Sequence, residues 1–140
     1  MTEYIKGDLL TTDAPIICHQ VNLQGVMGGG LAYAIAKKYP KVNEKYREYI
    51  YKELGRVCYA DADDFIVANC FSQEENFDTN YYALRECLID VNESMNTFNL
   101  DTVAIPYKYG CGIANGDWNI VLSIFEEVFA DKKLLIYIKE

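Results

Sequence analysis

Short apolar runs alternate along the chain with longer stretches in which apolar positions recur every three or four residues. Runs that are almost continuously apolar are typical of strands buried on both faces of a sheet. Four such runs are present, at residues 16–18, 65–71, 102–105 and 134–138. We expect weaker, edge-like strands around residues 4–5 and 57–59.

The stretches between these runs predict helices. One apolar face steps by four and three residues through Leu84, Leu88, Val91, Met95 and Phe98. Other helices are expected over residues 42–50, with Gly55 as a left-handed cap, from Trp118 onward, and over residues 31–38, ended by Pro40. This alternation predicts an α/β protein, a three-layer α/β/α sandwich around a central mixed, mostly parallel sheet.

Composition narrows the class of protein. The 140 residues suit a single domain spanning 1–140, and the 51% apolar content excludes a disordered chain. No apolar run is long enough to span a bilayer, and the first residues carry Glu3 where a signal peptide has bases, with no hydrophobic segment after it. Five cysteines without C-x-x-C spacing favour free thiols in a reducing compartment. We therefore expect a cytoplasmic monomer with no membrane partner, no cofactor and, with one histidine, no metal site.

The net charge of −8 argues against a basic surface that binds a nucleic-acid backbone, because affinity for phosphates comes from clustered Lys and Arg. We therefore expect no sequence-specific nucleic-acid binding. If this acidic chain binds a phosphorylated ligand, local dipoles must supply the attraction. Two glycine-bearing loops, at residues 18–30 and 106–117, each follow a buried strand and open a helix. Exposed glycine amides and helix N-termini can cradle a diphosphate, and Lys108 is the only lysine or arginine in the two loops. Alternatively, the glycines simply permit close packing of helix on sheet.

A dinucleotide-binding oxidoreductase is excluded. Gly110, Gly112 and Gly116 form G-x-G-x-x-x-G, which is one residue longer than the Rossmann fingerprint. This loop also lies near the C-terminus, whereas a Rossmann unit needs it early, with more sheet to follow.

Three motifs together resemble the macrodomain family, the ADP-ribose-binding module. They are KGDLL at residues 6–10, HQVN at 19–22 with GGGLA at 28–32, and IPYKYGCGIANGDW at 105–118. Within that family the chain is most similar to the branch that holds ADP-ribose-1″-phosphate phosphatases and terminal ADP-ribose glycohydrolases, including antitoxins that reverse DNA ADP-ribosylation.

The resemblance implies a role for particular residues. Asp8 and the Leu9 amide would read adenine, on which Tyr137 would stack, although Asp8 is equally an ordinary turn residue and Tyr137 an ordinary core tyrosine. Asn22 would hold the distal ribose. Glycine-loop residues would line that ribose (Gly28, Gly29, Gly30 and Leu31) or wrap the diphosphate (Gly110, Cys111, Gly112 and Ile113).

The candidate catalytic residues are His19 and Asp117. An imidazole near the distal ribose can act as a general acid or base, and Asp117 would activate water or orient His19. The alternatives are a structural histidine and a helix N-cap. The lysine and aspartate of the glycohydrolase branch are missing, since Ser72-Gln73 and Ala114 stand at the aligned positions.

The resemblance therefore implies binding of ADP-ribose or an ADP-ribosylated molecule. We expect water, with His19 and Asp117, to hydrolyse an ADP-ribose derivative at the distal ribose, either ADP-ribose-1″-phosphate or an ADP-ribosyl ester. The alternative is a non-catalytic reader or scavenger of ADP-ribose. Cys18 and Cys111 lack an identifiable base other than His19 and are interpreted as small residues at close-packed turns.

Overall fold

The computed structural model describes residues 1–112 and 114–139. Six strands in these residues form one sheet in the order β1-β6-β5-β2-β4-β3. All neighbouring strands are parallel except β3 and β4, which are antiparallel. The strands are β1 (Thr2–Lys6), β2 (Ile16–Val21), β3 (Val57–Asp61), β4 (Ile66–Phe71), β5 (Thr102–Pro106) and β6 (Lys133–Ile138).

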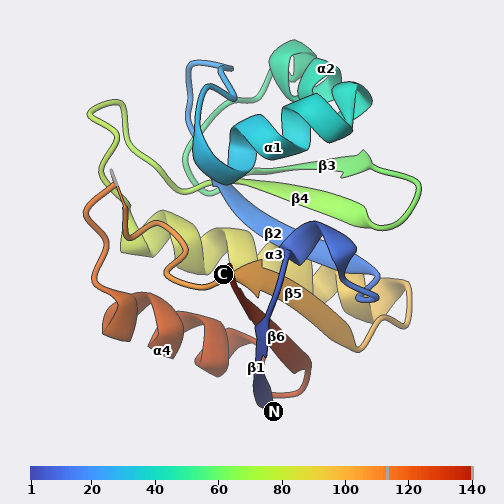
Figure 1. Cartoon of the computed structure of the whole chain (residues 1–140). Coiled ribbons are helices and arrows are strands. Elements are labelled where there is room, and N and C mark those ends of the chain that lie inside the picture. The colour runs from blue at the N-terminus through green and yellow to red at the C-terminus, as the bar shows by residue number, and fades with distance from the viewer. Residues whose placement is uncertain (113, 140) are drawn as a thin grey trace.

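Helices cover both faces of the sheet (Figure 1). In the described residues they are the short 3₁₀ helix η1 (Leu9–Thr11) and the α-helices α1 (Gly30–Lys38), α2 (Pro40–Glu48), α3 (Tyr81–Thr97) and α4 (Trp118–Val128). Side chains alternate across β2, so that Ile16 and Cys18 pack with α3 and α4, whereas Ile17 and Val21 pack with α1 and α2. The predicted three-layer α/β/α fold is confirmed. None of the described helices has the length and the apolar stretch that a bilayer crossing requires.

Two local expectations need correction. The strand predicted at residues 16–18 continues to Val21, because its polar positions also pair with β4, as in the His19–Asn69 pair. His19 therefore lies inside the strand and not in the loop that follows it. Gly55 does not cap α2, which ends at Glu48; with φ of +88° it lies in the turn before β3, where its amide donates to the Phe71 carbonyl.

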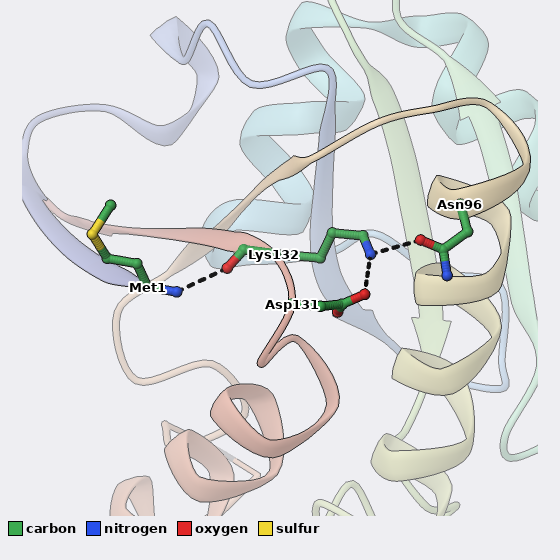
Figure 2. Close-up of polar contacts among 4 residues, drawn as sticks. All are labelled: Met1, Asn96, Asp131 and Lys132. Atoms are coloured by element: carbon green, nitrogen blue, oxygen red, sulfur yellow. Dashed lines mark hydrogen bonds and ion pairs between the residues drawn. The ribbon is translucent and has the colours of Figure 1, made fainter.

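A buried lysine joins elements at the opposite end of the sheet from the glycine loops. Lys132 is 6% exposed, and its ammonium donates to Asn96 Oδ1 on α3 and to Asp131 Oδ2, each at 2.7 Å (Figure 2). The Lys132 carbonyl accepts from the Met1 amino group at 2.9 Å. A buried charge is tolerated when its donors are satisfied in this way. The cluster thus fixes the end of α3 beside the start of β1 and β6.

Replacing Asn96 with alanine removes one of the two acceptors of this ammonium. We expect Asn96→Ala to lower the free energy of unfolding by about 1.5–3 kcal/mol, as for hydrogen bonds to charged groups. Urea denaturation measures this loss. Asn119→Ala is the matched control, since the Asn119 side chain makes no hydrogen bond within the described residues. Equal stability of the two variants would contradict a stabilising role for the cluster.

Candidate functional site

Three loops follow the carboxyl ends of β2, β4 and β5 at one edge of the sheet (Figure 1). Residues from all three loops line one cleft of about 760 Å³. The loops are residues 22–29 after β2, 72–80 after β4 and 107–117 after β5. Ligands of open α/β sheets bind at this edge. The described lining residues are His19, Gln20, Val21, Asn22, Gln24, Val26, Gly28, Gly29, Gly30, Leu31, Ala32, Gln73, Phe77, Pro106, Tyr107, Lys108, Tyr109, Gly110, Gly112 and Ala114. The two glycine loops therefore converge on the same space.

The first loop is organised by the side chain of Asn22. Its Oδ1 accepts from the amides of Gln24 and Val26 at 3.1 and 3.2 Å, and its Nδ2 donates to the Val26 carbonyl at 2.8 Å. The buried Tyr46 hydroxyl, on α2, lies 2.5 Å from the same Oδ1 and 2.6 Å from the Asn22 carbonyl. Burial raises the pKa of Tyr46 to about 12, so this hydroxyl stays protonated and able to donate. Asn22 lines the cleft, but its amide group chiefly shapes the loop.

The start of α1 lies at the cleft. Gly29 precedes the helix in extended conformation and has no side chain to cap it, and the first turn carries no acid. Gly29, Gly30, Leu31 and Ala32 all line the cleft. The first amides of an α-helix have no partner within the helix and carry partial positive charge. This end of α1 is therefore suited to an anion.

The second glycine loop closes on itself. The Gly116 amide donates to the Gly110 carbonyl at 2.9 Å, and a Cβ on Gly116 would lie 2.5 Å from that oxygen. Gly110 has φ of +69° and lies against Thr79, so it too must be glycine. Gly112 differs from both, because a Cβ there meets nothing within 4 Å. The fold therefore does not require glycine at position 112, and the lack of a side chain there leaves the cleft open.

Two further expected phosphate-loop residues have different outcomes. The Cys111 amide donates to the Lys108 carbonyl at 2.9 Å and its thiol to the Tyr109 carbonyl at 3.2 Å, so Cys111 is turned into the loop. It is not among the described residues that line the cleft, and burial raises the pKa of its thiol. Ile113 lies outside the described residues.

A polar network beneath the cleft joins the ends of three strands, and sequence reasoning missed it. The Ser72 hydroxyl lies 2.9 Å from Gln20 Oε1 and 2.8 Å from the Tyr109 hydroxyl. The Thr79 hydroxyl donates to the Gly110 carbonyl at 2.7 Å, and Gln20 Nε2 donates to Thr79 Oγ1 at 3.2 Å. Polar residues at the ends of apolar strands were the available signal. Their contacts hold the three loops in a fixed relation.

The cleft differs in charge from the rest of the molecule. Lys108 is the only charged side chain among its described lining residues, in a chain with a net charge of −8. No carboxylate is among the described lining residues, and the positive end of α1 lies at the cleft, so the local field favours an anion.

His19 is held as a neutral imidazole. Its side chain is 2% exposed, and Nε2 lies 2.6 Å from Asn69 Oδ1. Since Asn69 Nδ2 donates to the Cys58 carbonyl, the Asn69 oxygen faces His19, and Nε2 must carry the proton. Burial lowers the pKa of His19 to about 4, against the partial opposing effect of the Asn69 hydrogen bond. Nδ1 consequently carries the free lone pair at neutral pH.

Asp117 is placed at the start of α4. Its carboxylate accepts from the Asn119 amide at 2.9 Å as a helix N-cap, and its own amide donates to the Tyr81 hydroxyl. It is not among the described lining residues of the cleft, and its carboxylate makes no hydrogen bond to His19. The structure thus does not bring these two residues together as a pair.

The expected adenine residues lie outside the described lining of the cleft. The Asp8 carboxylate caps η1 by accepting from the Leu10 amide at 2.9 Å, and Leu9 is buried. The half-buried Tyr137 donates its hydroxyl to Thr12 Oγ1 at 2.8 Å. All three residues lie at the carboxyl ends of β1 and β6, next to β5 in the sheet.

Neither a metal centre nor an exposed reactive cysteine is built into the described residues. No three side chains of His, Cys, Asp or Glu within them are grouped to hold a metal ion. All five cysteines are free thiols, and Cys18, Cys58, Cys70 and Cys87 are buried.

The closed second loop predicts a large cost for one methyl group. Gly116→Ala places a Cβ within 2.5 Å of the Gly110 carbonyl, so we expect a loss of about 1–3 kcal/mol in the free energy of unfolding. Gly112→Ala, whose new methyl meets nothing, should unfold like the wild-type protein. Thermal or urea denaturation of the pair tests the loop geometry, and equal losses would contradict it.

His19 predicts a pH-dependent stability. Its pKa is about 4 in the folded protein and about 6.5 in the unfolded chain, so between these values only the unfolded state takes up the proton. Stability is full above pH 6.5 and falls as the pH drops toward 4. We expect wild type to lose about 2 kcal/mol more than His19→Gln between pH 7.5 and 5, measured by urea denaturation. Parallel pH curves would exclude a buried neutral imidazole.

Comparison with known proteins agrees with this geometry. The family model for the Macro domain matches residues 18–125. An ADP-ribose 1″-phosphate phosphatase from Lodderomyces elongisporus is 42% identical over 71 residues, which cover 45% of this chain and 44% of that protein. The ADP-ribose glycohydrolase OARD1 of Bos taurus is 27% identical, with 96% and 89% covered. Matches to such phosphatases extend over about half of their length.

The same fold is found among solved structures. The macrodomain of Mycobacterium tuberculosis DarG superposes with a TM-score of 0.87 at 25% identity, and the superposition covers 98% of this chain and 97% of that one. The superposition thus shows that the two chains share one fold. Since the family model covers most of the chain, this protein belongs to the Macro domain family.

Proposed function

We propose that the cleft binds ADP-ribose and that the protein hydrolyses an ADP-ribose derivative at the distal ribose. The observation that carries the proposal is that the cleft between the two glycine loops has no carboxylate among its described lining residues, although the chain is strongly acidic. Backbone amides at the start of α1 and around the open Gly112 provide for a diphosphate what clustered lysines provide elsewhere.

The carboxyl edge of the sheet also has a suitable length. Adenine would lie at the β1 and β6 end, where one Asp8 oxygen is engaged by Leu10 and the other is available to the adenine amino group. The Tyr107 amide donates to the Tyr137 carbonyl and so connects this end to the cleft wall. From β6 to β4 there are three strand spacings, roughly 14 Å in all, which suits a dinucleotide-sized ligand.

For hydrolysis, His19 is the group that can accept a proton from water. In this proposal its Nδ1 takes that proton, while the water oxygen forms a bond to the substrate and the leaving group departs with the electron pair of the broken bond. A base with a pKa near 4 is weak, so positioning by the glycine loops must supply much of the rate. We assign Asp117 to capping α4, because its carboxylate is occupied there.

A second candidate is a non-catalytic reader of ADP-ribose. The observation that favours it is that both expected catalytic residues already make structural hydrogen bonds. His19 is hydrogen-bonded to Asn69, and Asp117 caps the start of α4. A reader requires the same cleft and no base.

The relatives set the range of chemistry for either candidate. Their names include an ADP-ribose 1″-phosphate phosphatase, an ADP-ribose glycohydrolase and a DNA ADP-ribosyl glycohydrolase. Each of these acts on ADP-ribose joined to another group. We propose that this chain does so as a monomer in the cytoplasm, where its five free thiols stay reduced.

A methyl group on Gly112 tests the binding site. Gly112→Ala should weaken ADP-ribose binding at least tenfold, because the methyl projects into the space that the diphosphate needs, while the melting temperature stays unchanged. Isothermal titration calorimetry with free ADP-ribose measures the change. If the wild-type protein gives no heat with ADP-ribose, the proposed function fails.

Incubation with substrates then separates an enzyme from a reader. We expect the wild-type protein to turn over ADP-ribose-1″-phosphate or a mono-ADP-ribosylated peptide, and His19→Gln to retain binding but lose most of that turnover. Since the His19 pKa is about 4, the rate should not depend on its titration between pH 6 and 8. Tight binding with both substrates unchanged would leave the reader.

A further inference from the structure

One aromatic side chain in the cleft is unexplained by folding. Phe77, in the loop at residues 72–80, lines the cleft and is 44% exposed. It belongs to neither hydrophobic core cluster of the described residues. Hydrophobic and aromatic side chains predominate in the lining of ligand pockets.

Phe77 also has a strained backbone. Its φ of +71° lies in the left-handed region that a bulky side chain disfavours. Surrounding contacts enforce this conformation: the Phe77 amide donates to the Glu74 carbonyl at 2.8 Å, and the Phe77 carbonyl accepts from Gln73 Nε2 at 2.9 Å. Strain that neighbours hold in place clusters at ligand sites.

The loop that carries Phe77 is attached to the cleft wall. The Thr79 amide donates to the Ala114 carbonyl at 2.9 Å, and the Asn115 side chain donates to Asp78. These bonds join residues 72–80 to the second glycine loop, so the ring is positioned by the same structure that forms the diphosphate site.

Strand order places this loop at one end of the ligand path. The loops leave the carboxyl edge in the order β6, β5, β2, β4, so residues 72–80 lie furthest from the proposed adenine end. A ligand that extends from that end across the glycine loops presents to Phe77 whatever is attached to its distal ribose.

The charge of the loop selects among such attached groups. Residues 72–80 contain Glu74, Glu75 and Asp78 and no base. None of these acids forms an ion pair in the described part of the chain; Glu74 and Asp78 accept from the neutral amides of asparagine side chains. The loop therefore repels phosphate and a nucleic-acid backbone.

We propose that Phe77 is a specificity-determining residue, whose ring packs against the group joined to the distal ribose, and that this group is a polypeptide. The inference rests on the proposed function and adds to it the class of conjugate. A polypeptide supplies uncharged backbone and apolar side chains for the ring and is not repelled by the loop as an oligonucleotide is.

Calorimetry with three probes tests this proposal without requiring turnover. The probes are free ADP-ribose, a peptide that carries ADP-ribose through a hydrolysis-resistant linkage, and a short DNA oligonucleotide that carries it in the same way. Wild type should bind the peptide conjugate at least tenfold more tightly than the oligonucleotide conjugate. Phe77→Ala should weaken binding of the peptide conjugate about tenfold and change the affinity for free ADP-ribose by less than twofold.

Three variants serve as controls. Phe77→Tyr keeps the ring and should keep the preference for the peptide conjugate. Phe98→Ala removes a phenyl group that is 72% exposed and distant from the cleft, and it should change nothing. Glu75→Lys should strengthen binding of the oligonucleotide conjugate several-fold at low salt.

The outcomes separate this proposal from the proposed function. If the wild-type protein does not bind free ADP-ribose, both the proposed function and this inference fail. If wild type binds free ADP-ribose and Phe77→Ala weakens this binding as much as it weakens binding of the peptide conjugate, the ring contacts ADP-ribose itself. That result would overturn the inference. Tighter binding of the oligonucleotide conjugate by wild type would also overturn it.

Discussion

One carbonyl oxygen anchors the functional edge of the molecule. The Gly110 carbonyl accepts from the Gly116 amide at 2.9 Å and from the Thr79 hydroxyl at 2.7 Å. The first bond closes the loop between β5 and α4, and the second attaches the loop after β4. Through Gln20, which donates to Thr79, β2 joins the same point. The geometry of the cleft therefore requires glycine at positions 110 and 116, and chain flexibility is not the reason.

This construction lets an acidic protein offer a site to an anion. Attraction from a cationic cluster extends over many ångströms, whereas the dipoles of backbone amides act over short distances and only along their own direction. A site built from the start of α1 and an open glycine thus selects by shape as well as by charge. In the proposed specificity, acids outside the cleft, such as those beside Phe77, repel anionic groups that the amides do not reach.

The same edge holds a histidine whose protonation is fixed. Histidine usually titrates near neutral pH, but burial keeps His19 neutral, and the Asn69 oxygen holds its proton on Nε2. In this state it offers a lone pair on Nδ1 at any physiological pH. In the proposed function, different groups therefore bind the ligand and transfer the proton: backbone amides bind, and the imidazole accepts the proton.

The sequence by itself determined the layers of this fold. Continuous apolar runs marked the buried strands and three- and four-residue spacing marked the helices, because both patterns depend on local periodicity. It also identified the two glycine loops and their scarcity of charge. The register of the strands remained hidden: it extends β2 through His19 to Val21 and pairs His19 with Asn69, fifty residues away. Likewise, only the tertiary structure separated Gly112, where a methyl is free, from Gly116, where it meets a carbonyl. It also brought Phe77 to the cleft. Such features depend on contacts between distant segments, which no local pattern records.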